Sequence, residues 1–174
     1  MDKVSVIIPA YNRENTIIRA INSVINQDYQ PYEIIVIDDF SKDRTVEEVE
    51  KLKDNRIKII RHSKNLGAAA ARNTGIKQAT GNIIAFQDSD DYWYKEKLSK
   101  QMQVLINSDF QAIFSLYKRN YQNITEVIPD LKKQKKIKKD MKRVILTANY
   151  IGTPTLIVKK EVFNQIGYFD ENLF

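Results

Sequence analysis

The sequence contains no cysteine among its 174 residues. This absence excludes a disulfide scaffold, a zinc–thiolate site and a cysteine nucleophile, and it is compatible with a reducing compartment. No run of about 18 apolar residues occurs, so no segment is predicted to span a membrane. Residues 1–3 lead directly into a strand pattern, so we expect no signal peptide and a cytoplasmic location.

Three common catalytic or phosphate-binding motifs are also missing. No G-x-G-x-x-G follows the first predicted strand and no G-x-x-x-x-G-K-[ST] occurs, which argues against the usual dinucleotide fold and a P-loop. No G-x-S-x-G elbow is present either. The single histidine, His62, follows a short predicted strand, and no partner for it can be named. We interpret it as structural or solvated.

The net charge of +6 is concentrated in one place. Residues 132–143 hold eight basic residues and one aspartate, and the remainder of the chain is close to neutral. Nucleic-acid binding usually requires a basic face interleaved with aromatic residues, or a known module. Neither is found, so we expect no nucleic-acid partner. The basic stretch is either a peripheral contact with anionic lipids at the inner face of the membrane or a solvated lysine-rich loop.

Apolar periodicity predicts strands that alternate with helices. The predicted strands are 4–9, 33–38, 57–61, 83–86, 111–121 and 155–159; the predicted helices are 17–25, 41–52, 67–79, 97–106 and 140–148. This alternation with short connections predicts an α/β fold with a Rossmann-like, doubly wound, mainly parallel sheet flanked by helices. The strand at 57–61 is the more polar one and is expected at an edge.

Polar residues follow three of the predicted strands. They are Pro9-Ala-Tyr-Asn12, Asp38-Asp39 and Asp88-Ser-Asp-Asp91. In open α/β sheets, ligands bind beyond the carboxyl ends of the strands. We therefore expect these three loops to meet at one edge of the sheet and to form a composite site.

The third of these loops packs three carboxylates into four positions. Clustered carboxylates repel one another and favour a cation. On an extended backbone Asp88 and Asp90 would point the same way, which suits a divalent cation that also binds a phosphate group. The alternative is an acidic turn with an N-cap for the following helix.

Five segments together resemble a known family. They are VSVIIPAYNRE (4–14), IIVIDDFSKDRT (34–45), NLGAAAARNTGI (65–76), GNIIAFQDSDDYW (81–93) and IGYFDENLF (166–174). In this order and spacing they resemble the family 2 inverting glycosyltransferases of the GT-A fold. The resemblance covers nearly the whole chain apart from the basic stretch.

The resemblance implies roles for individual residues. Residues matching the nucleotide-binding positions are Pro9, Ala10, Tyr11, Glu14, Asp39, Arg72, Asp88 and Ser89. Those matching the metal ligands, for Mn²⁺ or Mg²⁺, are Asp88, Asp90 and Asp91. Within this set, Asp39 matches the carboxylate that hydrogen-bonds the base, and Arg72 lies near the diphosphate. Structural alternatives remain: Tyr11 as a core residue, Asp39 as a cap, and Arg72 paired with Asp43.

The resemblance also implies an activity. A sugar moves with inversion from a nucleoside diphosphate sugar, expected to be a UDP-sugar, to a hydroxyl acceptor. That acceptor is a saccharide or a lipid-linked saccharide, in surface polysaccharide or glycolipid synthesis. The family's general base follows the segment matching 167–170, so we expect it beyond Phe174. We accordingly divide the chain into a nucleotide-sugar-binding domain, 1–121, and a basic insert with the start of an acceptor-side portion, 122–174.

Two other functions compete with this one. The first is a non-catalytic nucleotide-binding module, or an incomplete donor-binding domain that is inactive without a C-terminal part. The second is a sugar-nucleotide nucleotidyltransferase. Enzymes of that second class usually carry a glycine- and arginine-rich loop after the first strand, and Pro9-Ala-Tyr-Asn12 does not have that composition.

Overall fold

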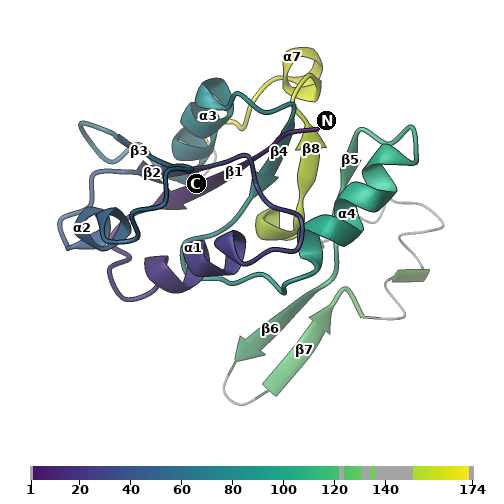
Figure 1. Ribbon diagram of the computed structural model, residues 1–174, viewed down its shortest axis with the longest axis horizontal. Helices are drawn as coiled ribbons and strands as arrows, with labels where there is room; N and C mark the ends of the chain where they lie inside the picture. Colours follow the sequence, from purple (N-terminus) through teal and green to yellow (C-terminus); the bar gives the residue numbers. More distant parts are fainter. Residues whose placement is uncertain (1, 122–123, 131–133, 136–150, 173–174) are drawn as a thin grey trace.

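The computed structural model describes residues 2–121, 124–130, 134–135 and 151–172. Its main sheet has six strands in the order β3-β2-β1-β4-β8-β5 (Figure 1). They are β3 (Ile57–Arg61), β2 (Glu33–Asp38), β1 (Val4–Ala10), β4 (Ile83–Phe86), β8 (Ile157–Lys159) and β5 (Ala112–Ile113). The first four of these pair in parallel, whereas β8 runs antiparallel to both of its neighbours. The predicted mainly parallel α/β fold, with Ile57–Arg61 at an edge, is confirmed.

Helices cover both faces of this sheet. On one face, α1 (Ile17–Ile25), α2 (Thr45–Glu50) and α4 (Lys97–Ile106) pack against alternate residues of β1, β2 and β4. On the other, α3 (Ala68–Gln78) and α7 (Val162–Ile166) pack against the intervening residues. Successive strand residues therefore feed two separate hydrophobic layers, because strand side chains alternate between faces. This explains why the central strands are apolar at nearly every position.

Helix α3 lies especially close to the sheet. Ala70 and Ala71 are buried, and a Cβ added at Gly75 would collide with the side chain of Ile7 in β1. The small residues of this segment thus allow a close approach, as the sequence predicts. The helix begins after Gly67, which has a φ of 89°, a left-handed conformation that glycine adopts without steric cost.

Two predicted elements differ from the structure. The predicted strand 111–121 is wrong as a single strand: its ends form β5 and β6 (Tyr117–Tyr121), which belong to different sheets. The apolar alternation ends before β6, whose polar residues are exposed. The predicted helix 41–52 is shorter, since α2 spans Thr45–Glu50 and has no side-chain cap. Before this helix, Asp43 Oδ1 accepts the Thr45 N–H at 3.0 Å, while Asp43 Oδ2 and the Ser41 hydroxyl bind the loop after β1, as described below.

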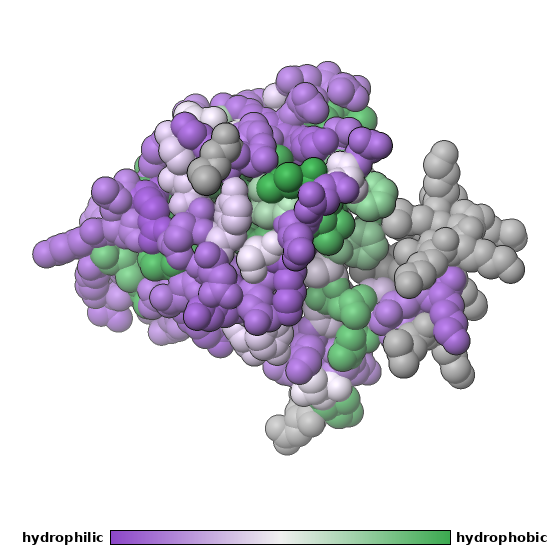
Figure 2. All heavy atoms as spheres, turned by 45° about the vertical axis from the view of Figure 1, so that its right-hand side comes forward, coloured by the Kyte–Doolittle hydropathy of each residue, from purple (hydrophilic) through white to green (hydrophobic). Residues whose placement is uncertain are grey.

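A separate antiparallel hairpin, β6 with β7 (Ile124–Ile128), protrudes from the main body (Figure 1). Apolar side chains are exposed on it, and Figure 2 shows green side chains at the lower end of the molecule, where the hairpin lies. No helix in the described part of the chain is long and apolar enough to cross a membrane.

The later part of the chain contributes to the same sheet. Strand β8 follows a short 3₁₀ helix, η1 (Thr153–Thr155), and lies between β4 and β5. Strand β8 and helix α7 pack onto strands of the portion 1–121. The division of the chain into a nucleotide-sugar-binding domain, 1–121, and an acceptor-side portion, 122–174, stays a prediction. The helix predicted at 140–148 lies outside the described residues, as does the basic stretch 132–143 apart from Gln134 and Lys135.

Candidate functional site

The loops after β1, β2 and β4 meet at one edge of the sheet, as the sequence predicts. These strands are parallel neighbours, with β2 on one side of β1 and β4 on the other. The chain therefore reverses its direction of winding at β1. Such a topological switch point is where open α/β sheets leave a crevice for a ligand.

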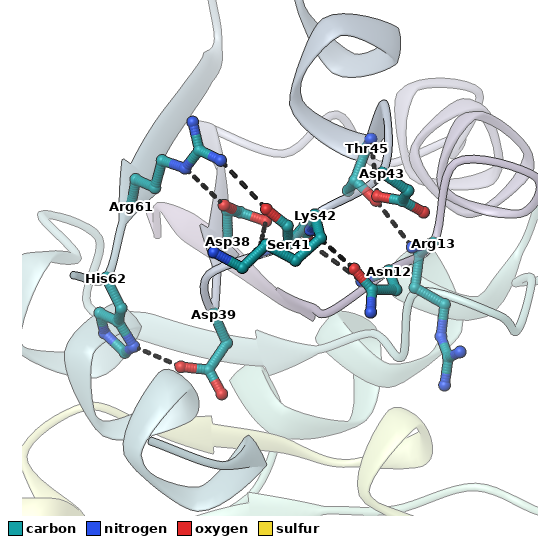
Figure 3. A network of polar contacts seen from close by, with 10 residues as sticks. All are labelled: Asn12, Arg13, Asp38, Asp39, Ser41, Lys42, Asp43, Thr45, Arg61 and His62. Carbon is teal, nitrogen blue, oxygen red and sulfur yellow. Dashed lines mark hydrogen bonds and ion pairs between the residues drawn. The ribbon is translucent and has the colours of Figure 1, made fainter. Parts of the chain in front are cut away.

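Side chains join the loops after β1 and β2 into one unit (Figure 3). Three consecutive backbone N–H groups donate to hydroxyl or carboxylate oxygens of the other loop. They run from Asn12 to Ser41 Oγ at 2.9 Å, from Arg13 to Thr45 Oγ1 at 2.7 Å and from Glu14 to Asp43 Oδ2 at 3.0 Å. In return, the Lys42 N–H donates to Asn12 Oδ1 at 2.8 Å. The two loops therefore have a fixed position relative to each other.

Asp39 is buried and surrounded by donors. Its Oδ1 lies 2.7 Å from Nδ1 of His62 and accepts the Leu66 N–H at 2.9 Å, and its Oδ2 accepts the Gly67 N–H at 2.8 Å. The His62 Nε2 lies 2.9 Å from Thr74 Oγ1. Asp39 thus binds the backbone of the two residues that precede α3, and its hydrogen bonds to the described residues include none to the turn after Asp39, where the structural alternative placed a cap. His62 is therefore structural, one of the two alternatives that the sequence left open, and its partners are Asp39 and Thr74.

Asp38 is also buried. Its Oδ1 accepts the Ser41 N–H at 3.2 Å, and its Oδ2 lies 3.0 Å from Nε of Arg61, an ion pair outside hydrogen-bond geometry. The parallel register of β2 and β3 places Asp38 opposite Arg61. Both acids of this loop therefore have partners within the protein: Arg61 pairs with Asp38, and His62 contacts Asp39 (Figure 3).

The acidic loop after β4 is held by arginines. Arg72 Nη2 donates to Asp88 Oδ1 at 2.8 Å, and Arg13 Nη2 lies 3.3 Å from Asp90 Oδ2. Arg19, from α1, donates to the backbone carbonyl of Asp90. The structural alternative, in which Arg72 pairs with Asp43, is therefore wrong. The contact of Arg13 with Asp90 joins this loop to the loop after β1.

The backbone of the acidic loop turns and is not extended. Strand β4 ends at Phe86, and the Asp91 N–H donates to the carbonyl of Asp88 at 3.1 Å. The prediction that Asp88 and Asp90 point the same way is therefore wrong, because the strand geometry on which it rested has already ended. The two carboxylates instead reach separate arginines, Arg72 and Arg13.

Among the described residues, Asp88 and Asp90 each form an ion pair with an arginine, whereas Asp91 forms none. Although Asp91 is exposed at the surface, partial desolvation of its carboxyl raises the pKa above the usual range, and the charges of Asp88 and Asp90 raise it further, against a lowering effect of Arg19. The three acids thus act on one another electrostatically. In the described residues, however, no three acidic, histidine or cysteine side chains are already arranged as a metal-binding group.

The remaining predicted residues line the same edge. Pro9 and Ala10 are buried at the end of β1, and Ser89 is 6% exposed. Tyr11 is 44% exposed, so the alternative of a core tyrosine is wrong. Glu14 accepts hydrogen bonds from the backbone N–H and Nε of Arg44, at 3.0 and 3.2 Å, so its carboxylate braces the loop after β2.

Sequence reasoning missed three residues of this site. Arg13 and Arg19 were overlooked although both stand near the predicted polar loop after the first strand. His62 follows β3 immediately, and its contact with Asp39 results from the β2–β3 register. The strand positions alone do not specify that register, so no direct signal in the sequence identified the pair.

The comparison with known protein families decides the family. Residues 5–167 match Glycosyl transferase family 2. The chain belongs to this family. Among its relatives is the *Escherichia coli* UDP-Glc:alpha-D-GlcNAc-diphosphoundecaprenol beta-1,3-glucosyltransferase WfgD, 42% identical over 114 residues, or 66% of this chain and 45% of that protein.

Solved structures confirm the GT-A-like fold. *S. aureus* TarS, in a fragment crystallised with UDP, aligns with a TM-score of 0.75 and 29% identity over 98% of this chain and 51% of that chain. The mannosyltransferase PcManGT of *Pyrobaculum calidifontis*, solved with GDP-Man and Mn²⁺, aligns with a TM-score of 0.74 and 23% identity over 99% and 49% of the two chains. The family 2 chain thus spans about half the length of these relatives.

Proposed function

We propose that this family 2 chain binds a nucleoside diphosphate sugar at the edge formed by the loops after β1, β2 and β4, and that the sugar passes to a hydroxyl acceptor. The observation that carries the proposal is that the Arg72–Asp88 pair follows β4 and the buried Asp39 follows β2, on the two sides of the topological switch point at β1. This arrangement offers an acceptor for a base on one side and cationic and anionic groups for a metal-bound diphosphate on the other.

The state of Asp39 favours uracil as the base. A carboxylate has about four lone-pair positions, and three are taken by His62, Leu66 and Gly67. One remains on Oδ2, which suits the single N3–H donor of uracil. Guanine presents two adjacent donors and would need both oxygens. The exposed ring of Tyr11 offers a surface for the base, so we propose a UDP-sugar as the donor.

The diphosphate would meet the arginines of the site. Within the part of the chain that the structure describes, the buried Nε of Arg72 has no hydrogen-bond partner, and an unpaired buried donor is costly unless a ligand accepts from it. A guanidinium also matches phosphate geometry better than an ammonium does. Arg72 is therefore the residue that we assign to the diphosphate, with Arg13 beside it.

The acids of the loop after β4 fit a divalent cation. Carboxylate oxygens are the ligands that Mg²⁺ and Mn²⁺ prefer, and the raised pKa of Asp91 reflects burial together with negative charge from Asp88 and Asp90 that a cation would offset. We assign the metal to Asp88, Asp90 and Asp91. A bound metal would supply Lewis-acid stabilisation of the leaving diphosphate.

The two acids near the end of the described chain, Asp170 and Glu171, have hydrogen-bond partners of their own. Asp170 Oδ1 accepts hydrogen bonds from Asn172, and Glu171 Oε1 accepts one from Asn73, so neither is assigned as the general base. That base remains predicted beyond Phe174. The Escherichia coli relative WfgD takes its name from alpha-D-GlcNAc-diphosphoundecaprenol, a lipid-linked diphosphate sugar. We propose an acceptor of the same class here, with residues 132–143 as a peripheral membrane contact.

Calorimetric titration with UDP, with and without Mn²⁺, tests the proposal. We expect metal-dependent binding of UDP in preference to GDP, and about 10- to 100-fold weaker binding by Asp90→Ala. Asp109→Ala, an exposed aspartate outside the site, is the control and should bind as the parent does. Absence of UDP binding, or equal binding by both variants, would contradict the proposed site. Binding without release of UDP from UDP-sugars would instead identify a non-catalytic nucleotide-binding module or a donor-binding domain that is inactive without a C-terminal part.

A further inference from the structure

Two adjacent residues of α3 hold two different segments. Arg72 binds Asp88 of the acidic loop, and Asn73 binds the segment 167–172, which follows α7. Asn73 is 2% exposed and lies about a hundred positions earlier in the chain than the residues it contacts. One turn of α3 therefore connects the acidic loop after β4 with the segment 167–172.

The Asn73 amide uses both of its ends. Its Oδ1 accepts the Phe169 N–H at 3.0 Å, and its Nδ2 donates to the Phe169 carbonyl at 2.9 Å. The same Nδ2 donates to Glu171 Oε1 at 2.8 Å. A side chain that binds both backbone groups of one residue fixes the orientation of that peptide, as a neighbouring strand would. The hydrogen bond to the Glu171 carboxylate is stronger than a neutral one.

Aromatic contacts place the same segment against the end of β4, from which the acidic loop begins. The Phe169 ring meets Phe86, the last residue of β4, edge to face, with centroids 5.4 Å apart at 88°. The Arg72 guanidinium lies 5.9 Å from the Phe169 ring centroid. Phe169 thus touches the strand that carries the acidic loop and the arginine that binds it.

We propose that Asn73 is a positioning residue, which holds residues 169–171 in one place relative to Asp88 and so sets where the acceptor side meets the donor. This inference rests on the proposed function. Asn73 itself contacts neither Asp39 nor the acidic loop in the hydrogen bonds described. Its loss should therefore disturb sugar transfer and leave nucleotide binding nearly unchanged.

The test compares Asn73→Asp with the double variant Asn73→Asp/Glu171→Gln. The single change removes both donations from Nδ2 and sets two carboxylates against each other. The second change supplies an amide that donates back to the introduced carboxylate. Asn164→Asp, the same chemical change at an exposed position of α7, is the control. The readouts are hydrogen exchange of the Phe169 amide, UDP affinity by calorimetry, and UDP release from UDP-glucose.

We expect Asn73→Asp to speed exchange at Phe169 about 10-fold or more, with most of that change reversed in the double variant and none in the control. UDP affinity should stay within about twofold, while the maximal rate of UDP release falls about 10-fold with little change in KM. Unchanged exchange, failure of the reversal, or a loosened segment with undiminished release would overturn the inference. If the parent chain binds no UDP, the proposed function fails, and exchange alone decides whether Asn73 holds the segment.

Discussion

The two acidic loops of the site, Asp38-Asp39 after β2 and Asp88–Asp91 after β4, follow similar buried strands but have different environments. Asp38 and Asp39 are buried, and backbone N–H groups, Arg61 and His62 surround them. In the loop after β4, Asp88 is partly exposed and Asp90 and Asp91 are exposed, and one acid has a raised pKa.

Burial and the number of hydrogen-bond donors distinguish structural carboxylates from ligand-binding ones. Buried carboxylates that accept several hydrogen bonds organise the loops around them, because their donors would otherwise be unpaired. Exposed, mutually repelling carboxylates that each have at most one arginine partner retain negative charge for a cation. Asp39 combines both properties, since it binds the backbone before α3, while its Oδ2 accepts only the Gly67 N–H among the hydrogen bonds of the described residues.

The largest expected effect on stability is at Asp39. Asp39→Asn should lower the free energy of unfolding by about 3 kcal/mol, since an amide cannot accept from His62, Leu66 and Gly67 together. Urea denaturation would measure the change. Asp88→Asn serves as the comparison at the other loop, and a larger loss there than at Asp39 would reverse the contrast between the two loops.

A third carboxylate, Glu33, extends the comparison to the opposite end of β2. Burial acts to raise its pKa, but hydrogen bonds from Lys58, Ser5 and Thr80 outweigh burial and lower the pKa to about 2. Because the folded pKa lies below the ordinary 4.5, the ionised group stabilises the fold above pH 4.5, and this contribution is lost as the pH falls toward 2.

Glu33→Gln should therefore cost about 2 kcal/mol at pH 7, after allowance for the half-exposed Lys58 partner. The difference from the parent should narrow as the pH falls below 4.5. Denaturant titrations of both proteins between neutral and acidic pH provide the measurement. A constant difference across that range would mean that the charge of Glu33 is not the stabilising feature.

Arg72 tests the ligand-binding loop directly. Arg72→Lys keeps the positive charge but removes the planar fork, so UDP should bind about 10-fold more weakly in the presence of Mn²⁺. Arg61→Lys is the matched control, because Arg61 pairs with Asp38 in the structural loop. Calorimetry should show a loss of UDP affinity for Arg72→Lys alone. Equal losses for both variants would contradict the distinction between a structural loop after β2 and a ligand-binding loop after β4.

The smallest expected effect is at Asp91, and its sign is opposite. Since burial, followed by the charges of Asp88 and Asp90, raises its folded pKa, the ionised carboxylate destabilises the protein above the ordinary pKa. Asp91→Asn should raise the free energy of unfolding by about 0.5 kcal/mol at neutral pH, a value reduced by solvent screening. The gain should disappear at acidic pH, and destabilisation at pH 7 would show that Asp91 has an unrecognised structural partner.

The strands and the edge where the loops meet were predictable because they depend on local patterns. Apolar runs identify the central strands, and parallel α/β topology then brings their carboxyl ends together. Small residues at Ala70, Ala71 and Gly75 likewise indicate a helix close to the sheet. These features need only short stretches of sequence and general rules of packing.

The contacts within the site were less predictable because they depend on register and on turns. His62 reaches Asp39 only through the pairing of β2 with β3. The turn after Phe86 separates Asp88 from Asp90 in a way that strand alternation does not anticipate. The hold of Asn73 on Phe169 joins residues about a hundred positions apart, and no local pattern specifies such a contact.

The central claim is that the loops after β1, β2 and β4 form a single UDP site. The most direct measurement is a map of backbone amide chemical-shift changes in the full chain when UDP and Mn²⁺ are added together. We expect the chemical-shift changes to be concentrated at Tyr11, at Asp39 and His62, and along Asp88–Asp91, with little change at the β6–β7 hairpin. Changes centred on the hairpin, or on only one of the three loops, would contradict it.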